Sequence, residues 1–318
     1  MQLDTFRDVI DTTRAEIGKA VHGQDDLVTL LLVSVFARGH CLLEGPPGTA
    51  KTLLAKTLAR TMEMDFGRIQ FTPDLMPGDV IGGNIYNFQS GSFHLVKGPI
   101  FTDILLADEI NRAPPKTQSA LLQGMNERIV TIDSDTYPLG ENFFVIATQN
   151  PIEQQGTYPL PEAQLDRFLF KLVVDFPDKE AELEILKRHR SKPIGFEPEK
   201  GDIKTVLDTE TLAAGRALVD TIRLDDTILS YILELVLATR NDAEIRHGVS
   251  TRAADALAGA VRARAAIEGR DYAIPDDVQA LMVPAFRHRI VLGPTAEIEG
   301  RTQEEVLLSL FNRIDAPR

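Results

Sequence analysis

The sequence of 318 residues is short of tryptophan, cysteine and long apolar runs. It contains no tryptophan and a single cysteine, Cys41, which excludes an intrachain disulfide and a metal site built from several thiolates. A prominent apolar stretch, residues 27–37, is shorter than the roughly 20 residues that span a bilayer, so it predicts a buried helix. The first residues lack the basic and then apolar pattern of a secretory signal. We therefore expect a cytoplasmic protein without membrane insertion, in which Cys41 is a small apolar core residue.

Positive charge is also scarce. The 34 lysines and arginines stand against 47 aspartates and glutamates, which gives a net charge of −13. Such a field repels a phosphodiester backbone, so we expect no nucleic-acid partner, although a local basic channel is compatible with this sum. The six histidines never stand at the spacing of metal ligands, so we expect them to be solvated or hydrogen-bonded.

What the first half does contain is an alternation of strand and helix patterns. Parallel strands that are buried on both faces read as continuous apolar runs, so ILLAD (residues 104–108) and FFVIAT (residues 143–148) predict central strands. The alternation predicts an α/β fold, a parallel sheet covered by helices. The expected strands span residues 40–43, 67–71, 104–108, 143–148 and 168–174.

Two segments interrupt this pattern and a third ends it. Residues 79–98, rich in glycine and aromatics, predict an insertion with a small hairpin or helix, and residues 127–137 alternate around an Asp-Ser-Asp turn, which predicts a hairpin. Residues 191–202 predict a linker, and the chain beyond it has helical periodicity. We expect an α/β core over residues 1–185 and an all-helical domain over residues 186–318. The expected helices of the latter span residues 225–240, 250–268, 275–286 and 302–314.

A glycine-rich turn, GPPGTAKT, joins a predicted strand directly to a helical pattern. Backbone N–H groups at such a helix start would surround a β-phosphate, Lys51 would reach the β- and γ-phosphate oxygens, and the Thr52 hydroxyl would ligate Mg²⁺. Ala50 stands where the usual pattern has glycine, which is tolerable if the backbone there is already helical. The alternative, an unremarkable turn, does not explain the strand and helix on either side. The expected nucleotide-binding residues are Gly45, Pro46, Pro47, Gly48, Thr49, Ala50, Lys51, Thr52 and Leu53.

Two acids end the predicted strand at residues 104–108, at the edge of the sheet where the glycine-rich turn also lies. Asp108 would hold Mg²⁺ directly or through water, and Glu109 would orient and polarise an attacking water. In isolation the acids are equally well explained as a solvated strand end. Together with the glycine-rich turn they predict a site for Mg²⁺ and ATP or ADP.

The motifs GPPGTAKT, ILLADEINRAPPKTQSALLQGMNE, VIATQNPIEQQGTYPLPEAQLDRF and GVSTRAADAL, in this order, resemble the MoxR branch of the AAA+ ATPases over most of the chain. The resemblance implies an ASCE-type P-loop core with strand order 5-1-4-3-2, an insertion near its second helix and a C-terminal helical lid. It also implies hexameric rings and chaperone-like remodelling of partner proteins. The implied partner is a separate protein with a von Willebrand factor A domain.

The resemblance assigns three further residues to ATP hydrolysis. Asn150 matches sensor 1, whose amide would help hold the water or the γ-phosphate, a role compatible with an Asn-Pro turn. Arg167 matches the arginine finger, which would reach the γ-phosphate of a neighbouring subunit; the alternative is a surface arginine paired to Asp166. Arg252 matches sensor 2, by which the lid would contact the nucleotide held by Lys51.

The remaining features are less specific. Gln24 matches the adenine-side segment, but a surface glutamine after a helix-terminal glycine explains it nearly as well. Arg112 would act across an interface or form a local salt bridge. The aromatics of the insertion would grip a partner in the ring pore or pack together. Because Lys51 and Arg252 would hold the same phosphates, we expect nucleotide to change the angle between core and lid.

The residues therefore favour an oligomeric Mg²⁺-dependent ATPase that remodels or activates partner proteins. The alternatives are the AAA+ subunit of a metal chelatase and a nucleotide-dependent scaffold that does not hydrolyse ATP, which would have no need of Glu109. A DNA motor is disfavoured by the net charge.

Overall fold

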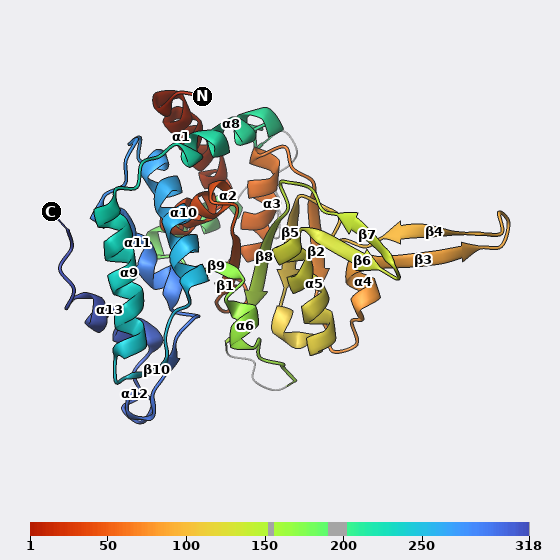
Figure 1. Cartoon of the computed structure of the whole chain (residues 1–318). Coiled ribbons are helices and arrows are strands. Elements are labelled where there is room, and N and C mark those ends of the chain that lie inside the picture. Colours follow the sequence, from red (N-terminus) through yellow and green to blue (C-terminus); the bar gives the residue numbers. More distant parts are fainter. Residues whose placement is uncertain (152–155, 190–201, 318) are drawn as a thin grey trace.

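A computed structural model describes residues 1–151, 156–189 and 202–317, and its centre is a five-stranded parallel sheet (Figure 1). The strand order is β2-β5-β8-β1-β9, which is the predicted order 5-1-4-3-2 read from the other edge. Every strand agrees with its predicted range to within one residue at each end. The strands are β1 (His40–Glu44), β2 (Phe66–Gln70), β5 (Ile104–Asp108), β8 (Phe144–Gln149) and β9 (Phe168–Val173).

The two faces of the sheet bury different residues because side chains alternate along a strand. Cys41 and Leu43 belong to the cluster under α1 (Leu3–Gly18), α2 (Asp25–Phe36) and α3 (Lys51–Thr61). Leu42 joins a second cluster under α5 (Pro115–Glu127). Cys41 is fully buried, and burial raises the pKa of its thiol to about 12, which confirms it as an apolar core residue rather than a nucleophile.

Both predicted hairpins are present. The insertion contains α4 (Pro77–Ile81) and the hairpin of β3 (Gly82–Asn87) and β4 (Ser92–Lys97), which projects from the body of the molecule (Figure 1). The second hairpin joins β6 (Ile129–Ile132) to β7 (Asp135–Pro138). At the tip of the first, Tyr86 packs edge-on against Phe88 and Phe93. The three residues are nevertheless 41%, 91% and 69% exposed, so the aromatics pack together and still face solvent.

The second half is mostly helical, as predicted. Predicted helix starts at Ser250 and Pro275 are confirmed: Ser250 caps α10, and Pro275 is the first residue of α11. It is not all-helical, because β10 (Ile245–His247) pairs with β11 (Val291–Leu292), and α13 ends three residues before its predicted limit. Of the predicted linker, residues 191–201 lie outside the described part. The helices here are α7 (Lys179–His189), α8 (Thr209–Asp220), α9 (Asp226–Asn241), α10 (Thr251–Ile267), α11 (Pro275–Phe286), α12 (Pro294–Ile298) and α13 (Gln303–Phe311).

The second half of the chain packs against α1 and α2 of the first half. One continuous apolar cluster includes Phe6 and Phe36 from the first two helices together with Leu257 and Leu281 from α10 and α11. In Figure 1 α10 accordingly lies beside α2, on the side of the sheet away from the projecting hairpin. The division of the chain at residue 185 stays a prediction. Across the described ranges, every helix is too short or too polar to traverse a bilayer.

Candidate nucleotide-binding site

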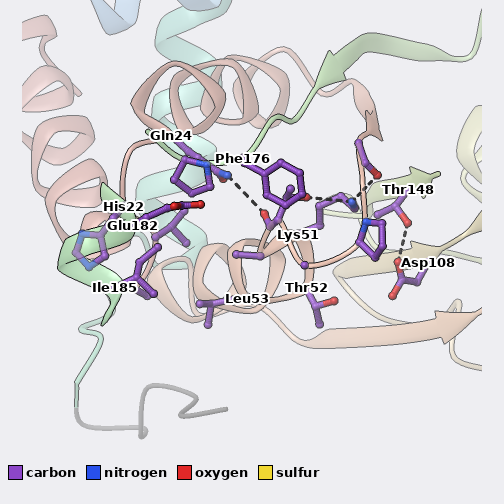
Figure 2. A pocket seen from close by; sticks show the side chains of 18 of the residues that line it. His22, Gln24, Lys51, Thr52, Leu53, Asp108, Thr148, Phe176, Glu182 and Ile185 are labelled. Carbon is purple, nitrogen blue, oxygen red and sulfur yellow. Dashed lines mark hydrogen bonds between the residues drawn. The ribbon is translucent and has the colours of Figure 1, made fainter. Parts of the chain in front are cut away.

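A cleft of about 1040 Å³ lies at the carboxyl ends of β1, β5 and β8, and we call it the P-loop cleft (Figure 2). The glycine-rich turn and the start of α3 form one wall, while the segment between α1 and α2 forms another. The structure brings most of the predicted residues together here. The predicted residues that line the cleft are Gln24, Gly45, Pro47, Gly48, Thr49, Ala50, Lys51, Thr52, Leu53, Asp108, Glu109 and Asn150.

The backbone of the turn explains its glycines and corrects one expectation. A Cβ on Gly45 would lie 2.2 Å from the carbonyl oxygen of Val174, the residue after β9, so only glycine fits at this position. Gly48 has a φ of 88°. The assumption that the backbone is already helical at Ala50 is wrong. Ala50 has a left-handed conformation, with φ 59°, and α3 begins only at Lys51. A non-glycine residue in this conformation costs about 1–2 kcal/mol, so the departure from the usual pattern introduces strain at this position.

The ammonium group of Lys51 lies within the turn. Its Nζ donates hydrogen bonds to the carbonyl oxygens of Gly45 and Pro46, at 2.9 and 2.7 Å, and to Thr49 Oγ1 at 3.1 Å. Burial lowers the pKa of Lys51, whereas the negative charges of Asp108 and Glu109 oppose that shift. Because these three acceptors are neutral, the lysine presents its charge to any anion that enters the turn.

Asp108 is held between the two strands that flank β5. Thr148 Oγ1 donates to Asp108 Oδ1 at 2.6 Å, and Arg68 Nη2 donates to Asp108 Oδ2 at 2.7 Å. Thr52 lines the same cleft (Figure 2). A hydroxyl and a carboxylate are the hard oxygen donors that Mg²⁺ prefers, so these residues fit the ion, and phosphates and water would supply its other ligands. Among the described residues, no cluster of three histidine, cysteine or acidic side chains forms an additional metal site.

Glu109 ends β5 in a left-handed conformation, at φ 55°. Its backbone N–H donates to Thr148 Oγ1 at 2.9 Å, and its Oε2 accepts from Arg112 Nη1 and from Gln70 Nε2, both at 3.0 Å. Arg112, which follows in the short 3₁₀ turn η1 (Ile110–Arg112), therefore forms the local salt bridge rather than standing free for a neighbour. The carboxylate is fixed at the open edge of the sheet, where a water molecule has access.

An apolar wall of the cleft was not predicted from the sequence: Phe176, Ile185 and Leu186 line the cleft. The polar side chains of His22 and Glu182 lie near Ile185 (Figure 2). Gln24 Nε2 lies 3.5 Å from the carbonyl oxygen of Thr49. Gln24 Oε1 is buried and makes no hydrogen bond within the described residues. The apolar wall forms because the start of α7 folds back against the segment between α1 and α2. The local signal for this wall in the sequence is the Phe176-Pro177 pair, which lies between β9 and α7.

Arg167 and Arg252 do not line the P-loop cleft. They line a second cavity of about 570 Å³, which we call the arginine cavity, between the sheet edge and α10. The structure does not bring Arg252 together with Lys51, as the predicted contact with one nucleotide requires, because α10 packs on α1 and α2. The charged residues of this cavity are Arg38, Arg128, Asp166, Arg167, Arg252, Asp255, Arg262 and Arg289.

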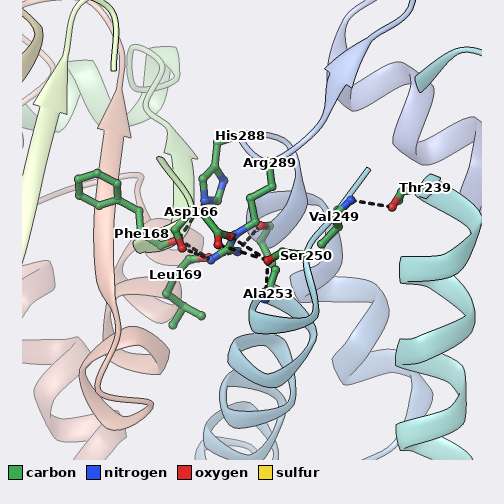
Figure 3. Close-up of polar contacts among 10 residues, drawn as sticks. Asp166, Phe168, Leu169, Thr239, Val249, Ser250, Ala253, His288 and Arg289 are labelled. Carbon is green, nitrogen blue, oxygen red and sulfur yellow. Dashed lines mark hydrogen bonds and ion pairs between the residues drawn. The ribbon is translucent and has the colours of Figure 1, made fainter. Parts of the chain in front are cut away.

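Asp166 fixes one wall of the arginine cavity (Figure 3). Its Oδ1 accepts from Arg289 Nε at 2.8 Å, and both its carboxylate oxygens accept from Ser250 Oγ, at 3.3 and 3.2 Å. The same serine caps α10 by accepting from the backbone N–H of Ala253 at 3.2 Å. Asp166 is thus paired with Arg289 and not with Arg167, whose Nη1 donates to the carbonyl oxygen of Leu122. This network ties the start of the helix that carries Arg252 to the loop that carries Arg167, so the two arginines share one cavity.

Comparison with known proteins covers nearly the whole chain. The family described as "ATPase family associated with various cellular activities (AAA)" matches residues 40–170, and the AAA lid domain matches residues 237–309. The chain is 44% identical to the uncharacterised protein YeaC of Bacillus subtilis, over 95% of this chain and 92% of that protein. It is 42% identical to Chaperone MoxR1 of Mycobacterium tuberculosis, over 95% and 81%. A crystal structure of a candidate ATPase from Cytophaga hutchinsonii superposes with a TM-score of 0.90 at 41% identity, covering 99% and 97% of the two chains.

Proposed function

Because this chain belongs to the MoxR family of AAA+ ATPases, we propose that it hydrolyses ATP with Mg²⁺ at the interfaces of a ring and uses the cycle to remodel or activate partner proteins. The observation that carries the proposal is the gathering of Lys51, Thr52, Asp108 and Glu109 in one cleft. A phosphate-binding turn alone would suit many nucleotide-binding proteins. A turn beside a carboxylate that is positioned for water suits hydrolysis.

Within the P-loop cleft each side chain has a distinct task. The turn and Lys51 would bind the phosphates, and Thr52 and Asp108 would hold Mg²⁺, whose charge stabilises the phosphate oxygens. Glu109 would orient a water toward the γ-phosphorus and accept its proton, and Asn150 would hold that water or the γ-phosphate. The apolar wall at Phe176 supports adenine binding, and the buried Gln24 Oε1 supplies an acceptor for its amino group.

The arginine cavity supports catalysis between subunits. Arg167 and Arg252 line the arginine cavity, and neither lines the P-loop cleft of their own chain. Six arginines line this cavity in a chain whose net charge is −13, and such a site is complementary to a triphosphate. We therefore assign both arginines to the nucleotide of a neighbouring subunit. Hydrolysis would then require assembly, for which the family suggests a hexamer.

The partner is proposed from the family. The relative named as a chaperone supports work on other proteins, and a separate protein with a von Willebrand factor A domain is the partner we propose. A pull-down with such proteins, in ATP and without nucleotide, tests this part by itself. Association that is the same in both conditions would remove this partner and leave the ATPase in place.

Steady-state hydrolysis measured against protein concentration, with light scattering for mass, tests the proposed activity. We expect specific activity to rise with assembly and to require Mg²⁺. Glu109→Gln should lower the hydrolysis rate on the order of 10²-fold while nucleotide still binds. Glu234→Gln, which changes an exposed acid on α9, is the matched control. No hydrolysis in assembled wild type would favour the nucleotide-dependent scaffold, and stimulated metal insertion into a porphyrin would favour the chelatase subunit.

A further inference from the structure

Arg68 links the two acids of the P-loop cleft without lining the cleft itself. Its Nη2 donates to Asp108 Oδ2 at 2.7 Å and to Gln70 Oε1 at 3.0 Å. Gln70 Nε2 in turn donates to Glu109 Oε2 at 3.0 Å. Because Arg68 and Gln70 are two residues apart on the edge strand β2, both side chains lie on the same face of the sheet, next to the end of β5.

The guanidinium group of Arg68 competes with a metal ion for Asp108. Thr148 already occupies Oδ1 of this carboxylate, and Arg68 occupies Oδ2. Only 14% of the Asp108 side chain is exposed, so few other directions are open to a ligand. Two cations at one carboxylate repel each other, and each binds more weakly while the other is present.

We propose that Arg68 is the resident counter-ion of Asp108 and that it is displaced when Mg²⁺ enters with the nucleotide. Arg68 thereby sets the Mg²⁺ concentration at which the cleft binds nucleotide tightly. Its departure also removes the partner of Gln70 Oε1, so the same exchange loosens one of the two side-chain hydrogen bonds that hold Glu109. The inference rests on the proposed Mg²⁺-dependent nucleotide site and adds a positioning residue to it.

Binding of a fluorescent, non-hydrolysable ATP analogue to the full chain tests the exchange without relying on activity. Binding is measured in EDTA and across a Mg²⁺ titration for wild type, Arg68→Gln and Arg68→Lys. In Arg68→Gln we expect the half-saturating Mg²⁺ concentration to fall about threefold, the size of effect that a partly exposed ion pair supports. Arg68→Lys keeps the charge and should stay close to wild type. Arg7→Gln removes an exposed arginine of α1 and should change nothing.

A double-mutant cycle locates the effect. In an Asp108→Asn background, Arg68→Gln should no longer shift the Mg²⁺ midpoint, because the carboxylate for which the cations compete is gone. An unchanged midpoint in the single variant would reduce Arg68 to a surface ion pair and overturn the proposal. Weaker binding at saturating Mg²⁺ would make Arg68 a ligand of the nucleotide and would also overturn it. If wild type bound no nucleotide in Mg²⁺, the proposed function itself would fail, which is a different result.

Discussion

The P-loop cleft and the arginine cavity have opposite charge and opposite construction. The cleft is lined by four acids and two lysines (Asp108, Glu109, Glu182, Asp202, Lys19 and Lys51), and its phosphate-binding turn is a single run of sequence. The cavity is lined by six arginines and two aspartates from segments more than 200 residues apart. In one chain the two sites lie apart. The cavity lacks the phosphate-binding turn, and the cleft lacks Arg167 and Arg252. This difference supports our proposal that the hydrolytic site is completed where the cavity of one subunit meets the cleft of the next.

The arginines of the cavity are not equivalent to one another. Arg289 has a side chain only 3% exposed and donates to Asp166 and to the carbonyl oxygens of Phe168 and Leu169. Arg252 is exposed at the start of α10. Arg289 therefore holds the wall together, whereas Arg252 and Arg167 are the members that we expect to meet phosphate.

The largest effect is expected from Arg167→Ala, which removes an arginine from the arginine cavity and leaves the P-loop cleft intact. An arginine that neutralises transition-state charge contributes about 10³-fold or more to phosphoryl transfer, so hydrolysis by assembled protein should fall by about that factor. Nucleotide affinity of the isolated chain should not change, since Arg167 does not line the cleft. Rate and affinity are measured on the same preparation. Loss of affinity without loss of rate would place Arg167 at its own nucleotide.

The next effect concerns stability. Asp166→Asn leaves the buried guanidinium of Arg289 without its carboxylate, and breaking such a pair costs about 3 kcal/mol of unfolding free energy. Urea unfolding measures this loss. Asp225→Asn is the control, because its partner Arg223 is 66% exposed and the pair contributes less than about 1 kcal/mol. Equal losses in the two variants would show that burial does not distinguish the cavity wall from the surface.

His40, which also lines the arginine cavity, should make the folding stability depend on pH. Burial lowers its pKa to about 4, against the hydrogen bond with the Met125 carbonyl oxygen that favours the charged form. The unfolded chain binds this proton near pH 6.5 and the folded chain only near pH 4, so stability is full above pH 6.5 and falls as the pH drops toward 4. We expect a loss of about 2 kcal/mol between pH 7 and pH 5, to which the buried His288 adds with the same sign.

Urea unfolding of wild type and His40→Gln at both pH values measures that slope. The glutamine variant should lose less stability on acidification than wild type, whatever its stability at pH 7. Equal losses of stability in the two proteins would show that His40 does not cause the pH dependence.

The smallest effect on stability is expected at Ala50, in the turn of the P-loop cleft. Ala50→Gly relieves the strain of the left-handed residue, at about 1–2 kcal/mol, but adds the entropy of glycine in the unfolded chain, at about 0.5–1 kcal/mol. We expect a net gain of about 0.5 kcal/mol, seen as a higher urea midpoint. Ala50→Val should lower the midpoint instead, since a β-branched residue suits this backbone less. A stabilising valine would show that the turn is not left-handed here.

Contiguous motifs predicted the cleft well. The residues from Gly45 to Leu53 form one turn and one helix start, and Asp108 ends a strand with a clear apolar run. Because ligand sites in parallel sheets lie at the carboxyl ends of the strands, these local patterns predicted that the residues lie together. The conformation of Ala50 was missed because the pattern records the residue type and not its φ. Arg68 was missed because its partner lies 40 residues along the chain, on the next strand.

The arginine cavity was not predictable in the same way. The family resemblance assigned Arg252 to the nucleotide. Helical periodicity identifies α10 but does not say on which side of the sheet the helix packs. That choice depends on apolar contacts of α10 with α1 and α2, more than 200 residues away in sequence. Sequence similarity identified the two arginines, and only the packing placed them in one cavity.

A subunit-mixing experiment tests the shared site most directly. Lys51→Ala destroys the cleft and spares the cavity, whereas Arg167→Ala does the reverse, so neither assembly should hydrolyse ATP alone. In an equal mixture, interfaces that join an intact cleft to an intact cavity should restore about a quarter of the wild-type rate, as expected for random neighbours in a ring. A mixture no more active than its separate components, although light scattering shows mixed assemblies, would mean that each chain completes its own site and would contradict the account.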